Sequence, residues 1–304
     1  MEHSFYLFKC QVIQEKKYIA EHYISKILLT ETIYKADSTV EFHLNGWGSI
    51  ILRSQFQTKF EYFWRGLKNI EGWKDINWRE GERYVFRLQK RIYAASRCGD
   101  VKRIRKLQKT LMRSWFNRVL SVRRVTQDNQ GKKTAGVDGV KSLSPNSRLE
   151  LARELKITGK SKPTRRVWID KQYSDEKRPL GIPTMHDRAL QAVVKAALEP
   201  EWEALFEPNS YGFRPGRSPH DAVKQIKNCI QHKAKYVLDA DLAKCFDRIN
   251  HEALLNKLNM KGKVRQQIKA WLKSGVIDKG AFTATSEGTP QGGVATPPTI
   301  WQNI

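Results

Sequence analysis

The sequence predicts an α+β fold, on three observations. Apolar residues recur at helical spacing in several segments, polar turns divide other segments into β-hairpins, and the two patterns alternate without the regular strand–helix–strand order of a doubly wound sheet. A chain of 304 residues with 40% hydrophobic and 10% aromatic residues can bury ample core, which argues against a wholly disordered protein. The length allows about two or three domains.

One β-hairpin is predicted within residues 1–70. Apolar and polar residues alternate in Glu41–Leu44, an apolar run follows at Ile50–Leu52, and a turn at Asn45-Gly46 separates the two. Nothing in this stretch points to chemistry. We expect residues 1–70 to be an unassigned leader, or read-through of upstream sequence rather than a domain.

Two amphipathic helices are predicted from Trp73 onward. Their apolar residues lie three or four positions apart, as on one helix face: Val85, Leu88, Ile92 and Ala95 in the first helix, and Ile104, Leu107 and Leu111 in the second. Gly99-Asp100 separates the two helices.

Positive charge is concentrated in this helical segment. The chain has 55 Lys and Arg against 31 Asp and Glu, a formal net charge of +24. Nine basic residues and no acid lie between positions 102 and 124: Lys102, Arg103, Arg105, Lys106, Lys109, Arg113, Arg118, Arg123 and Arg124. A helix face built only for solubility mixes both signs, so we favour contact with nucleic-acid phosphates over a solvated face. An acidic membrane surface is the competing partner, but no basic helix with a long Trp/Phe face favours it.

The remaining elements lie further along the chain. Residues 126–147 are polar and Gly-rich and are predicted as a loop, and residues 165–183 as a hairpin around Ser174-Asp175-Glu176. Four more helices are predicted, at Asp187–Leu205, at Pro219–Gln231 with Ser218 as its cap, at His251–Leu258 and at Val264–Lys273.

A strand ending in carboxylates is predicted at Tyr236–Leu242. Alternation along it places Asp239 and Asp241 on one face. Acids at the end of a core strand are costly unless a cation or hydrogen bonds offset them, and in a basic chain they indicate a Mg²⁺ site for phosphoryl or nucleotidyl transfer. Equally, they could cap the following helix or pair with Lys244 and Arg248.

Two loops also have the composition of a binding surface. Ser210–Asp221 interleaves aromatics, glycines and arginines, which suits backbone contact and base stacking on single strands, although an ordinary loop could have the same composition. Glu287–Gly293 is a glycine-rich turn that would let its backbone approach a substrate closely.

Membrane and disulfide classes are disfavoured. The four cysteines are far apart without a Cys-x-x-Cys pair, no apolar run approaches the ~18 residues of a membrane span, and the amino terminus lacks a signal-peptide pattern. We expect a soluble intracellular protein, cytoplasmic in a bacterium, with an organelle as the other location.

Five motifs in order resemble those of group II intron reverse transcriptases, the intron-encoded maturases. They are Thr134-Ala-Gly-Val-Asp-Gly139, Arg178-Pro-Leu-Gly-Ile-Pro183, Ser210-Tyr-Gly-Phe-Arg-Pro-Gly-Arg217, Asp241-Leu-Ala-Lys-Cys-Phe-Asp247 and Gly288-Thr-Pro-Gln-Gly-Gly293. The resemblance implies right-hand polymerase fingers and an incomplete palm after a helical N-terminal extension. The implied boundaries are 71–125 for the extension, 126–235 for the fingers and start of the palm, and 236–304 for the incomplete palm.

The resemblance also implies roles in nucleotide binding. Asp241 would be the catalytic, metal-binding aspartate and Phe246 the steric gate against a 2′-hydroxyl. Lys171 and Arg178 would grip the triphosphate of the incoming deoxynucleotide, and Gln291 would line the nucleotide and template pocket. The implied cofactor is Mg²⁺, which would activate the primer 3′-hydroxyl and steady the pyrophosphate.

The implied partners are intron or template RNA, a primer and deoxynucleoside triphosphates. Asp239 and Asp247 would support the site without binding metal. The RNA-binding candidates are Arg103, Lys106, Arg113, Arg123 and Arg124 of the basic helices, with Arg214 and Arg217 of the aromatic loop.

The sequence departs from the family pattern after Gly293. The family has a Tyr-x-Asp-Asp turn downstream, whereas this sequence stops at Ile304 with a different continuation, as a frameshift or early stop would produce. One carboxylate cannot hold two Mg²⁺ ions against their repulsion, so we expect the isolated chain not to polymerise. The alternatives are a non-catalytic RNA-binding or splicing-assistance fragment, and a reverse transcriptase of another bacterial retroelement.

Overall fold

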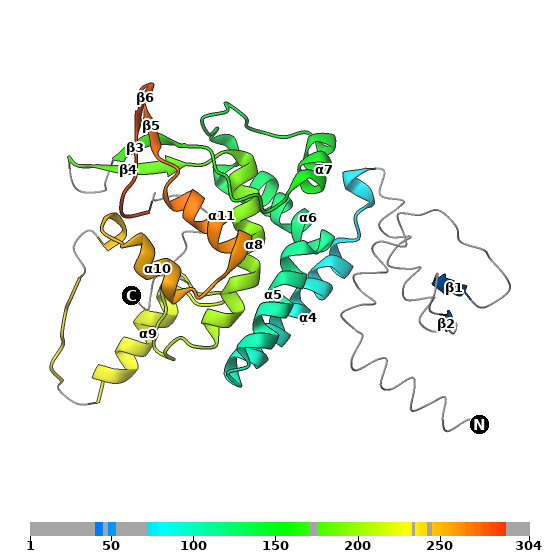
Figure 1. Ribbon diagram of the computed structural model, residues 1–304. Coiled ribbons are helices and arrows are strands. Elements are labelled where there is room, and N and C mark those ends of the chain that lie inside the picture. Colours follow the sequence, from blue (N-terminus) through cyan, green and yellow to red (C-terminus); the bar gives the residue numbers. More distant parts are fainter. Residues whose placement is uncertain are drawn as a thin grey trace. The chain divides into compact units, whose positions relative to one another are not determined.

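The computed structural model describes residues 72–170, 175–232, 235–241 and 245–289, together with the backbone of two strands near the amino terminus (Figure 1). The chain divides into two compact units, Met1–Ile70 and Glu71–Ile304. In the first unit, β1 (Val40–Leu44) pairs antiparallel with β2 (Gly48–Leu52), with Phe42 opposite Ile50. The predicted hairpin at this position is confirmed.

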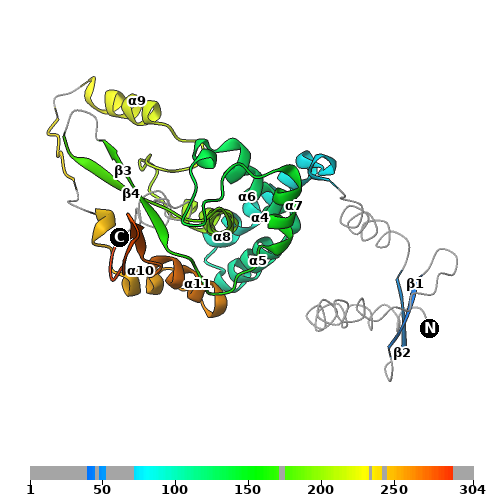
Figure 2. The same ribbon diagram turned by 90° about the horizontal axis from the view of Figure 1, so that it is seen from above.

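Helices form most of the second unit. The first five are α4 (Trp78–Arg97), α5 (Val101–Arg113), α6 (Trp115–Arg123), α7 (Pro145–Glu154) and α8 (Met185–Glu203). Helix α8 packs against α4, α5 and α6, and Figure 2 shows it end-on among its neighbours. Its residues are buried on nearly all sides, as expected for a helix at the centre of a core. Seven apolar residues predicted for the first two helices face this core: Val85, Leu88, Ile92, Ala95, Ile104, Leu107 and Leu111.

Side-chain caps fix where these helices begin. The Asn77 side chain accepts a hydrogen bond from the Glu80 amide at 3.1 Å, and Asp100 does the same for Arg103 at 2.9 Å. At α8, the Thr184 hydroxyl accepts from the Asp187 amide at 3.1 Å. Each cap satisfies an amide that has no partner inside its own helix.

A small mixed sheet lies beside the helices, with strand order β4-β3-β5-β6. Its strands are β3 (Thr164–Asp170), β4 (Lys177–Ile182), β5 (Val276–Asp278) and β6 (Ala281–Thr283). The β3–β4 hairpin matches the prediction, with Ile169 opposite Arg178. The β5–β6 hairpin was not predicted, because two three-residue strands are too short to show an alternating pattern.

Three helices complete the described part of the chain, and all three match predicted positions. They are α9 (Pro219–Ile230), α10 (His251–Lys257) and α11 (Gly262–Leu272). Ser218 caps α9 as expected, through a reciprocal pair of hydrogen bonds with Asp221. The mixture of helices with one small mixed sheet is an α+β fold.

Two predictions are wrong. The strand at Tyr236–Leu242 does not form over the described residues 235–241, where Tyr236, Val237 and Leu238 are exposed. A strand needs a neighbouring strand for its backbone hydrogen bonds, and the sheet described here has none at this position. The predicted loop at 126–147 contains a π-helical turn at Arg124–Asp128, a 3-10 turn at Gln130–Lys133 and the start of α7.

In the part of the chain that the structure describes, no helix combines the length and apolar character that a membrane crossing requires.

Candidate functional site

Two sequence motifs meet at the start of α8. The buried Arg188 guanidinium donates to the carbonyl oxygens of Pro183 (3.0 Å), Gly131 (2.9 Å) and Thr134 (2.6 Å). A Cβ on Gly136 would lie 2.8 Å from the Pro183 carbonyl oxygen, so only glycine fits this contact. The motif 134–139 is thereby held on the end of the motif 178–183.

The environment of Arg188 lowers its pKa, chiefly through burial. Asp138 raises the pKa and Arg165 lowers it further. An arginine keeps its proton at neutral pH in spite of such shifts, so all three carbonyl contacts are charge-assisted.

A second pair of motifs meets beside α10. The Thr289 amide donates to the Phe246 carbonyl at 2.8 Å, and the Gly288 amide donates to the Ile249 carbonyl at 2.9 Å. A Cβ on Gly288 would lie 2.5 Å from the Asp247 carbonyl oxygen, and the Gly288 φ of 75° also favours glycine. The backbone of the predicted steric gate is therefore fixed by the glycine-rich turn.

His251 reinforces this second junction. Its Nε2 lies 2.6 Å from the Gly288 carbonyl oxygen, so Nε2 carries the hydrogen, and the ring is buried. Within the described residues, the buried His251 Nδ1 and Thr289 hydroxyl have no hydrogen-bond partner. His251 has no distinctive sequence pattern, and Thr289 belongs to the motif 288–293 without having been predicted as a site residue.

The predicted nucleotide-binding residues that the structure describes differ in their secondary structure. Asp241 is exposed and lies in neither helix nor strand, and Phe246 is half-buried in a 3-10 turn at Cys245–Asp247. Arg178 is exposed on β4, on the same sheet face as Ile169. Lys171 and Gln291 lie outside the described residues.

Some basic side chains of these helices are exposed to solvent, and others turn toward the core. Arg103, Lys106 and Arg113 are exposed on α5. Arg105 instead turns inward, where its Nη1 lies 2.6 Å from the Glu201 carboxylate and its Nη2 donates to the Leu258 carbonyl at 3.2 Å. Helical spacing places Arg105 beside the buried Gln108, but it does not specify Glu201 as the partner of Arg105.

The other two candidates of the basic run differ in their surroundings. The Arg123 guanidinium lies 4.9 Å from the centre of the Trp78 ring and 3.3 Å from the Glu82 carboxylate. Arg124 is exposed.

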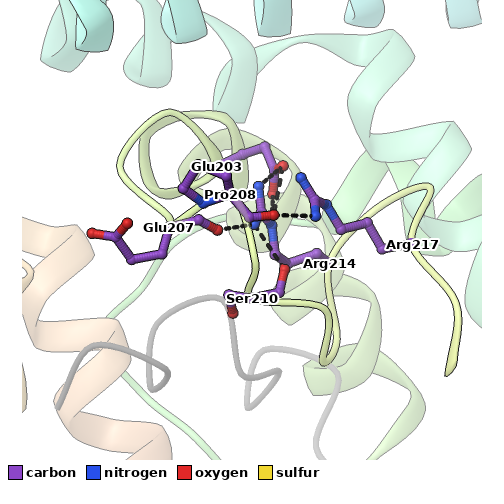
Figure 3. Close-up of polar contacts among 6 residues, drawn as sticks. All are labelled: Glu203, Glu207, Pro208, Ser210, Arg214 and Arg217. Atoms are coloured by element: carbon purple, nitrogen blue, oxygen red, sulfur yellow. Dashed lines mark hydrogen bonds and ion pairs between the residues drawn. The ribbon is translucent and has the colours of Figure 1, made fainter. Parts of the chain in front are cut away.

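Arg214 and Arg217 hold their own loop (Figure 3). Arg214 is buried, and its guanidinium binds the Glu203 carboxylate at 2.6 Å and the carbonyl oxygens of Glu207 and Ser210 at 2.7 and 2.9 Å. Arg217 donates to the Pro208 carbonyl at 2.6 Å. Both arginines therefore have partners inside the chain, and their contact with RNA stays a prediction.

Comparison with known proteins identifies two consecutive domains. Residues 73–155 match the N-terminal domain of reverse transcriptase, and residues 168–304 match reverse transcriptase (RNA-dependent DNA polymerase). The group II intron-encoded protein LtrA of Lactococcus lactis subsp. cremoris is 38% identical over 175 residues, which cover 56% of this chain and 29% of LtrA. The chain belongs to the group II intron reverse transcriptase/maturase family.

Two other relatives of this chain are similar over comparable lengths. Protein YkfC of Escherichia coli is 38% identical over 187 residues, covering 57% of this chain and 49% of YkfC. Maturase-like protein 1 of Euglena gracilis is 31% identical over 204 residues, covering 62% of this chain and 43% of the relative. The matched region thus spans half or less of each of these three relatives.

Reverse transcriptases generally use Mg²⁺. Within residues 72–289, apart from the three short gaps in the description, no three His, Cys, Asp or Glu side chains come together. Asp241 is the one predicted metal ligand among the described residues.

Proposed function

We propose that this chain is the template-holding part of an RNA-directed DNA polymerase of the group II intron class. The reaction would be nucleotidyl transfer onto a primer 3′-hydroxyl, directed by an RNA template. The observation that carries the proposal is the junction of Phe246 and Asp247 with Gly288 and Thr289. Two backbone hydrogen bonds join the turn of Phe246 to the turn that leads to Gln291, which supports a shared role of these two residues in binding the nucleotide.

The proposed residue roles follow the chemistry of a deoxynucleoside triphosphate. Arg178 and Lys171 would bind its phosphates, since arginine offers a bidentate fork and lysine a point charge. Phe246 would contact the sugar, and Asp241 would carry the catalytic carboxylate. We assign residues 71–125 to the extension, 126–235 to the fingers and start of the palm, and 236–304 to the palm.

Primer extension tests this proposal. The chain is incubated with a primer annealed to an RNA template, deoxynucleotides and Mg²⁺, with the Asp241→Ala variant as control. RNA retention is scored by filter binding in the same samples. We expect no extension by the chain alone. Extension that Asp241→Ala abolishes would support the role of Asp241 and overturn that expectation, whereas extension that persists in Asp241→Ala would overturn the role of this aspartate.

The second candidate function is RNA binding without catalysis, as in splicing assistance. The exposed cations of α5 favour it, because phosphate contact there does not involve Asp241. It predicts RNA retention that falls steeply with salt, is equal in wild type and Asp241→Ala, and is accompanied by no extension. Failure of both extension and RNA retention would contradict both candidates.

A further inference from the structure

Helix α4 presents a regular stripe of cations and aromatic rings to solvent. The stripe consists of Arg79, Arg83, Phe86, Lys90, Tyr93 and Arg97, spaced alternately four and three residues apart and all exposed. At 3.6 residues per turn, they fall within an arc of about 80° along about 27 Å of helix. The buried residues Val85, Leu88 and Ile92 lie on the opposite side, so the stripe is not part of the core.

The two rings of the stripe are exposed to a degree that packing does not explain. Phe86 is 59% and Tyr93 41% exposed. The Lys90 ammonium lies 5.4 Å from the centre of the Phe86 ring, so cation and ring share one surface patch. Leaving large apolar rings in water forgoes burial free energy, which a partner can recover.

The charge on this face is of one sign. All four charged residues of the stripe are basic, and the two acids of α4, Glu80 and Glu82, lie in its first turns outside the stripe. Glu82 is in addition paired with Arg123 at 3.3 Å. The face therefore complements a polyanion that also carries planar aromatic groups, which can stack on the two rings.

We infer that the α4 stripe binds a single-stranded polynucleotide, by stacking unpaired bases on Phe86 and Tyr93 between phosphate contacts to the basic residues. The two rings are about 10 Å apart along the helix, far enough to stack separate bases. Single strands expose base faces for such stacking, whereas a duplex already stacks its bases on one another. This binding mode rests on the RNA binding proposed above and specifies that the strand is unpaired.

Helix α5 provides an internal comparison. Lys102, Lys106, Lys109 and Arg113 repeat the same four- and three-residue spacing on its exposed side, without any aromatic residue. Such a face contacts phosphates but offers no stacking platform. It therefore contributes affinity for single and double strands alike.

The test measures dissociation constants by fluorescence anisotropy over a salt series. The probes are a short unstructured RNA, the DNA of the same sequence, the RNA annealed to its complement, and polyglutamate. The full chain is compared with Phe86→Leu/Tyr93→Leu, with the ring-preserving Phe86→Trp/Tyr93→Trp, and with Lys102→Gln/Lys109→Gln. Circular dichroism checks that helix content is equal in all four proteins.

The expected results separate stacking from charge. Loss of both rings weakens single-strand binding roughly tenfold or more and leaves the duplex affinity and the salt slope unchanged, while the tryptophan variant keeps single-strand affinity. The α5 variant loses affinity for both forms, and its salt slope on single strands falls by about 1.4. Equal loss on RNA and DNA would assign the contact to bases, and a greater loss on RNA would add the 2′-hydroxyl.

Two outcomes would overturn the stripe's role. If the α5 variant weakens RNA binding but loss of the rings does not, RNA binding stands and the stacking mode is wrong. If loss of the rings weakens polyglutamate binding as strongly as RNA binding, the rings serve an acidic protein partner instead. Absence of any RNA binding by the unaltered chain would reject the proposed function itself.

Discussion

Single residues decide how the sequence motifs of this chain meet. Arg188 and Arg214 have buried guanidinium groups that donate to backbone carbonyls of loops. A buried cation is costly unless its donors are satisfied, and a carbonyl-rich loop satisfies several at once. Gly136 and Gly288 act at the same scale, since each lets one loop backbone touch another.

We expect Arg214→Lys to destabilise the protein by about 3 kcal/mol, because lysine cannot replace the bidentate contact to Glu203 and leaves two carbonyls unpaired. Urea unfolding measures this change. Arg217→Lys is the matched control, with a loss of about 1 kcal/mol or less, since Arg217 is only half-buried and contacts the Pro208 carbonyl and the Tyr211 ring. Unchanged stability with weakened RNA binding in Arg214→Lys would favour the RNA-contact role instead.

Gly136→Ala should cost about 1–3 kcal/mol, because its Cβ would meet the Pro183 carbonyl oxygen at 2.8 Å and force the two motifs apart. Gly131→Ala tests the same loop without the clash, since its Cβ would have no neighbour closer than 3.6 Å. Thermal unfolding of both variants checks the prediction. Equal stability of the two alanine variants would mean that the close approach at Gly136 is not maintained.

At the scale of elements, ion pairs join the neighbouring helices α10 and α11. The Glu252 carboxylate of α10 lies 2.9 Å from the Lys269 ammonium and 3.1 Å from the Arg265 guanidinium, both on α11. The Lys269 hydrogen bond and charge, followed by the charges of Arg265 and Lys273, lower the pKa of Glu252. This contact lies at the surface and links two helices that are short by themselves.

The lowered pKa of Glu252 gives a signed pH dependence. A carboxyl whose pKa is depressed in the folded state stabilises the protein above its unfolded pKa of about 4.3 and loses that contribution as pH falls through the folded value. Glu252→Gln should therefore lower the melting temperature slightly at neutral pH and make no difference at a pH of about 2–3. A melting-temperature difference that is the same at both pH values would contradict this linkage.

At the scale of the whole second unit, one polar cluster joins three helices that are distant in sequence. The Glu201 carboxylate of α8 accepts from Arg105 and from Gln108 of α5, each at 2.6 Å. Arg105 also donates to the Leu258 carbonyl, at the end of α10. These three hydrogen bonds join residues that are 96, 93 and 153 positions apart in the sequence, and they connect α5 with α8 and with the end of α10.

Arg105→Met should lower the free energy of unfolding by about 2–3 kcal/mol, because Glu201 would keep a largely buried charge with one partner fewer. Lys109→Met on the exposed side of the same helix is the control and should change stability by about 0.5 kcal/mol or less. Urea unfolding compares the two. An equally small effect of both variants would show that the cluster does not hold the three helices together.

The positions of the candidate site residues could be predicted from the sequence, whereas the buried contacts that hold their loops could not. The positions of Asp241, Phe246 and Arg178 follow from motif spacing, and their roles remain predictions. The buried contacts of Arg188, His251 and Arg214 could not be predicted, because each partner carbonyl belongs to a loop whose position no local pattern encodes.

The sequence by itself determined the elements whose signals are local. Hydrophobic spacing and side-chain caps act between residues a few positions apart, which is why α4, α5, α8 and the β3–β4 hairpin were predicted correctly. Only the tertiary structure decided that β5 pairs with β3, that residues 235–241 form no strand, and that Arg105 faces Glu201 while Lys106 faces solvent. The physical reason is that strand pairing and burial of charge depend on partners roughly a hundred residues away, which local patterns do not specify.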